Sequence, residues 1–181
     1  MNISELVTAV FSWGTLFADV VLVLFILCLV IKNGFADRTV SWVGERALGI
    51  SFLLALSGLL GSLIYSEVVG FEPCILCWVQ RLFLYPQVVL LGLGFWWKDK
   101  SILPYAYGLS VLGGIVAFYH SFTNLGGHSF TPCTSDGGAC AKQYVLEFGY
   151  ITIPVMALTI FALMVVTFIA EKKRSKIFSI K

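Results

Sequence analysis

Five stretches of this chain are long and apolar enough to cross a lipid bilayer as helices, and they take up most of the sequence. A spanning helix needs about 20 largely apolar residues. The expected spans are approximately 14–31, 47–69, 78–97, 102–122 and 150–170. With 59% hydrophobic and 12% charged residues among 181, the chain is predicted to be an all-α integral membrane protein, which excludes an ordinary soluble domain. No segment has nucleic-acid-binding features.

The first stretch is interpreted as a retained span and not as a signal peptide. The residues before it carry Glu5 and no Lys or Arg, so the basic segment that opens a signal peptide is missing. The chain therefore keeps five spans, and its two ends are expected on opposite sides of the membrane.

The distribution of positive charge predicts which side is which. Ten of the twelve Lys and Arg residues fall in the first connection, the third connection and the tail: Lys32, Arg38, Arg46, Lys98, Lys100, Lys172, Lys173, Arg174, Lys176 and Lys181. All three places lie on one side if five spans alternate, and basic loops mark the cytoplasmic side. The amino terminus is then outside and the carboxyl terminus in the cytoplasm. In a bacterium this places the protein in the inner, cytoplasmic membrane.

Four of the five cysteines fall on the predicted outer face. Cys74 and Cys77 form a Cys-x-x-Cys pair at the start of the third span, and Cys133 and Cys140 lie in the long connection before the last span. The outside is the oxidising compartment, so two disulfides are expected there. Four cysteines allow three pairings, which the sequence leaves open. Proximity favours the two local pairs, and a switch between pairings would itself be a mechanism.

The first cysteine pair is expected to share a helix face with an arginine. If Pro73 takes the first helical position, Cys74, Cys77 and Arg81 project from one face. The positive end of the helix dipole favours a thiolate at such a position, although Glu72 opposes it. A membrane quinone suits this pattern, because it needs an electron-rich thiolate near its ring and a cation for its reduced oxygen.

Two further polar residues are candidates for the same site. Gln80 places an amide beside Arg81, and His120 ends the fourth span on the outer side, where it can help to bind a quinone or move protons. Each observation also has a plainer interpretation. Arg81 can reach the lipid head groups, the cysteines can form structural disulfides, and His120 can be an ordinary interfacial residue.

Several motifs, taken in order, resemble the DsbB family of disulfide bond formation proteins, especially its BdbC-like branch. The match runs from about residue 46 to residue 170 and rests mainly on the segment from Pro73 to Pro86, which contains the Cys-x-x-Cys and Gln-Arg. Other matching segments are 61–67, 117–120, the second cysteine pair and 151–154. The resemblance implies a four-helix bundle in the bacterial inner membrane. Such a bundle passes electrons from a periplasmic DsbA-like thioredoxin-fold oxidase to ubiquinone or menaquinone.

The resemblance also implies a role for each cysteine. Cys133, paired with Cys140, would exchange with the partner's cysteines, and Cys74 and Cys77 would reoxidise that pair. Cys77 would contact the quinone, with Arg81 stabilising the charged intermediate. The chain departs from the family in its first span. We therefore expect an additional helix and its cytoplasmic connection in 1–45, a DsbB-like bundle in 46–170 and a basic cytoplasmic tail in 171–181.

Three alternatives remain open from the sequence. A vitamin K epoxide reductase-like enzyme also couples two outer cysteine pairs to a quinone, but the Gln-Arg after the Cys-x-x-Cys favours the DsbB-like interpretation. The second alternative is a membrane protein that binds a metal through the four thiolates. An oxidising compartment disfavours this alternative. The third is a structural subunit with two disulfides.

Overall fold

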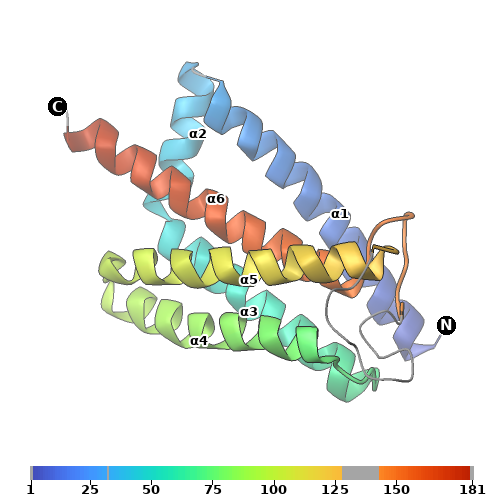
Figure 1. The fold of residues 1–181 in the computed structure, drawn as a ribbon. Helices are drawn as coiled ribbons and strands as arrows, with labels where there is room; N and C mark the ends of the chain where they lie inside the picture. Colours follow the sequence, from blue (N-terminus) through green and yellow to red (C-terminus); the bar gives the residue numbers. More distant parts are fainter. Residues whose placement is uncertain (1, 32, 128–142, 180–181) are drawn as a thin grey trace.

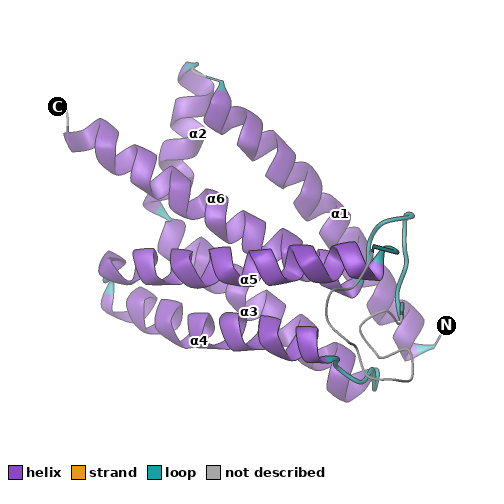
Figure 2. Ribbon diagram, viewed as in Figure 1, coloured by secondary structure: helices purple, strands orange, loops and turns teal. Residues whose placement is uncertain are grey.

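The computed structural model describes residues 2–31, 33–127 and 143–179, the last four by backbone alone. Long helices joined by short connections make up these residues, as Figures 1 and 2 show. Outside the helices, the described residues contain one isolated β-bridge, between Glu147 and Ile151. The elements are α1 (Ile3–Val30), α2 (Gly34–Glu45), α3 (Ala47–Leu63) with a π-helical end η1 (Ile64–Val68), α4 (Ile75–Trp97), a 3-10 turn η2 (Lys100–Ile102), α5 (Leu103–Asn124) and α6 (Ile153–Ser179).

The prediction of an all-α protein with five spans is confirmed. Five segments are long and apolar enough to cross a membrane, namely Ile3–Val30, Ala47–Val68, Ile75–Trp97, Lys100–Asn124 and Ile153–Ser175. The first of them begins eleven residues earlier than the expected Gly14. Its polar first turn is helical because the Glu5 carboxylate accepts a hydrogen bond from the Asn2 backbone N–H at 3.0 Å.

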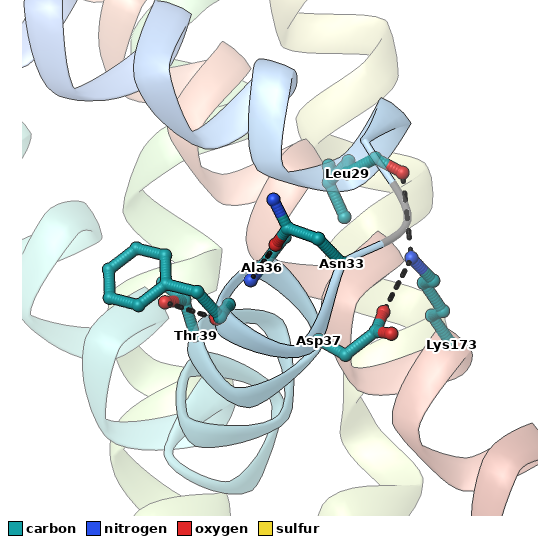
Figure 3. Close-up of polar contacts among 7 residues, drawn as sticks. Leu29, Asn33, Ala36, Asp37, Thr39 and Lys173 are labelled. Carbon is teal, nitrogen blue, oxygen red and sulfur yellow. Dashed lines mark hydrogen bonds and ion pairs between the residues drawn. The ribbon is translucent and has the colours of Figure 1, made fainter.

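The connection between the first two spans is itself a helix, α2, which the hydropathy analysis missed because the segment is too polar to span a membrane. Asn33 caps this helix by accepting a hydrogen bond from the Ala36 N–H at 2.7 Å. Lys173 of α6 joins the three neighbouring elements: its Nζ lies 3.6 Å from Asp37 Oδ1 and donates to the Leu29 carbonyl of α1 (Figure 3). These contacts fix α2 against both α1 and α6.

Helices α3 to α6 pack together as a four-helix bundle around one apolar core, which includes Leu84, Leu91, Phe161 and Met164. Gly113 of α5 permits close packing, because a Cβ atom there would lie 2.5 Å from the Phe161 ring of α6. A buried polar contact joins α5 to α4: the Ser110 hydroxyl donates to Gln87 Oε1 at 2.8 Å. Small residues and interhelical hydrogen bonds of this kind are typical of helix packing in membranes.

Helix α1 runs obliquely to α4 and α5 in Figure 1 and is the least buried of the five spans. Its buried residues are Ser12 and Thr15. Besides the Lys173 contact, Asp19 anchors it to the bundle by accepting hydrogen bonds from the Thr159 hydroxyl of α6 at 2.6 Å and from the Tyr150 hydroxyl at 2.9 Å. A carboxylate within a span is costly unless it is paired, and these two donors pair it.

The two ends of the bundle differ in chemistry. The carboxyl ends of α3 and α5 and the amino ends of α4 and α6 meet at the end that carries Cys74 and Cys77, which we call the cysteine end (Figure 1). Arg46, Lys98, Lys100 and Lys173 lie at the opposite, basic end. Lys100 Nζ there donates to the Glu45 carbonyl at 3.1 Å. The observed arrangement therefore separates the thiols from most of the positive charge.

Candidate redox site

The site begins with the way α4 starts. Cys74 is the N-cap of this helix, and its sulfur accepts a hydrogen bond from the Cys77 backbone N–H at 3.4 Å. The expectation that Pro73 is the first helical residue is wrong, because the helix begins at Ile75. The Cys74 sulfur has the position that a Ser or Asp oxygen usually takes in an N-cap. Cys74, Cys77 and Arg81 line one cavity, which agrees with the prediction that they share one helix face.

The Cys-x-x-Cys pair is present as two thiols. The Cys74 sulfur donates toward the Cys77 sulfur, 3.2 Å away. This hydrogen bond and burial raise the pKa of the Cys74 thiol to about 12, while a hydrogen bond with His120 acts in the opposite direction. The proton of the pair is therefore held on Cys74. A negative charge on the Cys77 sulfur would be stabilised by that proton.

His120 lies against Cys74. Its Nε2 is 3.5 Å from the Cys74 sulfur, and its Nδ1 is 2.9 Å from Gln80 Nε2. An amide nitrogen can only donate, so Nδ1 accepts and the neutral ring carries its proton on Nε2, facing the sulfur. The ring is 2% exposed, so this sulfur and this amide have little competition from solvent. Gln80, His120 and Cys74 are therefore connected by two successive hydrogen bonds.

Arg81 lies deeper in the same cavity and is 7% exposed. Its Nε donates to Ser62 Oγ at 2.8 Å, its Nη2 donates to the Ser62 carbonyl at 2.9 Å, and its guanidinium lies 5.0 Å from the centre of the Trp78 ring. Among the described residues, no carboxylate lies within ion-pair distance of it. Neutral groups thus hold the cation in place without neutralising it, which leaves it able to attract an anion.

Two adjoining cavities surround Arg81. The cysteine cavity, about 60 Å³, contains Cys74, Cys77 and His120 in its walls. The inner cavity, about 80 Å³, extends away from the cysteines between α3, α4 and α6 and has mostly apolar walls. Ser62, Tyr65, Arg81 and Ile153 line both cavities. An apolar ring with two polar oxygens fits this combination of walls, but both cavities are smaller than usual ligand pockets, so entry requires side chains to move.

A series of aromatic rings packs beside the cavities. The ring centroids of Phe11 and Tyr65 are 5.5 Å apart, those of Tyr65 and Phe71 are 5.9 Å apart, and those of Phe71 and Tyr144 are 4.5 Å apart. The sequence analysis missed these residues and Ser62. Ser62 and Tyr65 could have been identified as site candidates from the sequence, because both belong to the segment 61–67 that carries part of the family resemblance. The π-helical turn η1, which holds Tyr65, is a feature often found at functional sites.

Of the seven residues predicted for the site, the structure brings five together: Cys74, Cys77, Gln80, Arg81 and His120. Cys133 and Cys140 lie outside the described residues. The described chain before and after them, up to Gly127 and from Gln143, lies at the cysteine end. Gln143 Nε2 donates there to the Asn124 carbonyl at 2.6 Å.

Three residues of the site are also arranged so that they could hold a metal ion. The ligand atoms of Cys74, Cys77 and His120 all lie within 4.8 Å of one another. Two thiolates and an imidazole are donors that zinc and other thiophilic ions accept. The arrangement is therefore compatible with a metal as well as with thiol exchange.

Comparison with known proteins shows which family the chain belongs to. The model of the family described as disulfide bond formation protein DsbB matches residues 44–170. The chain belongs to the DsbB family. All seven predicted site residues fall inside the matched region, while α1 and most of α2 precede it. No solved structure gives a significant match to the chain.

Curated relatives are similar over the same region. The SPbeta prophage-derived disulfide bond formation protein B of Bacillus subtilis is 42% identical over 112 residues, 62% of this chain and 76% of that protein. Disulfide bond formation protein C of the same organism is 37% identical over 118 residues, 64% and 85% of the two chains. A probable disulfide formation protein C 2 of Bacillus anthracis is 35% identical over 130 residues, 71% and 93%. The chain is thus a multi-pass membrane oxidoreductase of disulfide bond formation.

Proposed function

We propose that the protein is a protein-dithiol:quinone oxidoreductase. It reoxidises a DsbA-like thioredoxin-fold oxidase outside the cytoplasm and passes the electrons to ubiquinone or menaquinone in the bilayer. The observation that carries this proposal is the position of Arg81, a buried cation without a carboxylate partner among the described residues, in the same cavity as the Cys74 and Cys77 thiols. Two thiols supply electrons, and an unneutralised cation favours an acceptor that gains negative charge.

The reaction begins with two thiol exchanges. A thiolate of the reduced partner attacks the Cys133–Cys140 disulfide, and the resulting mixed disulfide resolves into oxidised partner and reduced Cys133 and Cys140. That dithiol then reduces a Cys74–Cys77 disulfide in the same way. Two electrons and two protons move at each exchange, and each requires a thiolate in line with a reachable sulfur. The roles of Cys133 and Cys140 come from the family resemblance.

The second half of the reaction oxidises the Cys74–Cys77 dithiol to a disulfide. The quinone substrate is the acceptor: it takes up two electrons and two protons and leaves as a quinol. Cys77 is the electron donor, because the hydrogen bond from Cys74 stabilises its thiolate. His120 Nε2 is placed to exchange a proton with Cys74, with Gln80 orienting the ring. Arg81 stabilises negative charge on the acceptor oxygen.

The distribution of charge supports a location for this reaction on the outer side of the cytoplasmic membrane. Arg46, Lys98, Lys100 and Lys173 lie at the basic end, and positive residues favour the cytoplasmic side of a membrane. The cysteine end then faces outward, which in a bacterium is the periplasmic or outer face of the inner membrane. There it meets the partner oxidase, while the cavities adjoin the membrane quinone pool.

A second candidate function rests on the metal-ligand geometry of Cys74, Cys77 and His120. As a thiolate metal site the protein would hold an ion and would not turn over. Metal content and free thiols, measured on protein purified from membranes without chelator, separate the two functions. One zinc or copper ion per chain, bound at Cys74 and Cys77, would favour the metal site.

Steady-state electron transfer tests the proposed function. Purified protein in lipid vesicles receives a reduced thioredoxin-fold oxidase and either ubiquinone or menaquinone, and the absorbance of the quinone is followed. We expect dithiol-dependent reduction by the wild-type protein and none by Cys77→Ser. Absence of quinone reduction with both quinones, in protein whose four outer cysteines are intact and reducible, would contradict the proposal.

A further inference from the structure

The helix that the family match does not cover reaches the inner cavity. Phe11 of α1 is part of the wall of that cavity, together with residues of α3, α4 and α6. The matched region alone would leave this part of the wall open, since α1 supplies it from outside residues 44–170. Arg81 lines the same cavity, so Phe11 and the redox site share one space.

The contact between Phe11 and the bundle is close. A Cβ atom on Gly61 of α3 would lie 3.1 Å from Phe11 Cε1, so the absence of a side chain at Gly61 is what admits the ring. The ring also packs against Tyr65, with centroids 5.5 Å apart. Phe11 therefore fills a place that α3 leaves for it.

Helix α1 is held in this position by polar contacts at two places, near its middle and near its carboxyl end, and is otherwise little buried. Asp19 ties it to Thr159 and Tyr150, two turns from Phe11, and Lys173 ties its far end to α6. Across the rest of its length α1 is mainly exposed to lipid. Of the helices that line the inner cavity, α1 is thus the one whose displacement disturbs the fewest buried contacts. Both cavities are small, so a ring can enter only where a wall moves.

We propose that α1 forms the lipid-side wall of the quinone site and that Phe11 is a quinone-binding residue. The hydrogen bonds of Asp19 hold that wall in place. This inference rests on the proposed function, because it assigns part of the site at which the electron acceptor binds. It gives the additional helix a role that the four-helix bundle does not provide by itself.

Binding of a photoreactive azidoquinone to the full-length protein in vesicles tests the inference. Illumination followed by peptide mass spectrometry locates the label, and a titration gives the dissociation constant. We expect label on the α1 peptide that contains Phe11. We also expect roughly 2- to 10-fold weaker binding in Phe11→Trp, since Gly61 and Tyr65 leave the larger ring no space except the cavity.

Phe17→Trp is the matched control, because Phe17 is on the same helix and is 72% exposed. It should bind the quinone as the wild type does. Label confined to α3, α4 and α6, or binding by Phe11→Trp that is unchanged or tighter, would overturn the inference and leave the proposed function intact. If the wild-type protein incorporates no label anywhere and reduces no quinone, the proposed function itself fails.

Discussion

Cys74 Sγ and His120 Nε2 lie 3.5 Å apart, although the two residues come from different helices and are 46 positions apart in the chain. The contact places a titratable ring against the sulfur that carries the proton of the Cys-x-x-Cys pair. It connects the docking of α5 on α4 directly to the reactivity of the thiols.

The first prediction concerns the acidity of Cys74. Replacing Cys77 by Ala removes the hydrogen bond that is the largest cause of the raised pKa, so the pKa of Cys74 should fall from about 12. A lower pKa gives more thiolate at a given pH and faster alkylation. Adding His120→Ala should move the alkylation profile back to higher pH, because His120 lowers this pKa. Peptide-resolved iodoacetamide labelling of the reduced protein across pH measures both shifts. No upward shift on removing His120 would contradict its assignment.

Gln80 is predicted to be a positioning residue that acts through His120. Gln80→Ala should shift the Cys74 alkylation profile in the same direction as His120→Ala but less, because the ring loses the donor that fixes its tautomer. Gln87→Ala is the control, since Gln87 is a buried amide of the same helix that bonds with Ser110 instead. Equal profiles for the Gln80 and Gln87 variants would show that the amide does not act through the imidazole.

Arg81→Leu should separate the two halves of the reaction. Loss of the cation is expected to lower kcat/KM for quinone by about 100-fold, the usual effect of removing one such donor. Exchange between the partner and the cysteines should remain near the wild-type rate. Stopped-flow measurements of each half, with Arg81→Lys as the charge-conserving control, test this. Wild-type quinone kinetics in Arg81→Leu would remove the arginine from the mechanism.

Two glycines of α5 should differ sharply in their tolerance of a methyl group. Gly113→Ala is expected to destabilise the bundle by ~1–3 kcal/mol, because its Cβ atom would overlap the Phe161 ring. A Cβ atom on Gly108 meets nothing within 4 Å, so Gly108→Ala should be neutral or slightly stabilising. Thermal or denaturant unfolding in one detergent compares them. Equal stability of the two variants would show that α5 and α6 do not pack as described.

Hydropathy predicted the five spans, because a lipid environment demands long apolar helices wherever the chain crosses it. Helical spacing predicted that Cys74, Cys77 and Arg81 share one helix face, and all three line one cavity in the structure. The position of His120 at the end of the fourth span predicted that it lies at the same end of the bundle as Cys74. Its contact with Cys74 could not be predicted, because that contact depends on how α4 and α5 dock.

The packing of α1 against the bundle also could not be predicted from the sequence, for a physical reason. In a membrane, a face that packs on other helices and a face that meets lipid are both apolar, so hydropathy does not distinguish Phe11 from Phe17. The charged residue Asp19 within the span was a signal that α1 has a partner, but its donors Thr159 and Tyr150 are 140 and 131 residues away in the chain. Helix α2 was missed because it is amphipathic and short.

The most direct test of the central claim is a single turnover without oxygen. Fully reduced Cys133→Ser/Cys140→Ser protein, which cannot pass the disulfide on to the second cysteine pair, is mixed with one equivalent of quinone. Quinol is measured by absorbance, and the state of Cys74 and Cys77 is determined by differential alkylation and mass spectrometry. The account predicts one quinol for each Cys74–Cys77 disulfide formed, and no quinol from Cys77→Ser. Quinone that stays oxidised, or quinol that appears while Cys74 and Cys77 remain reduced, would contradict it.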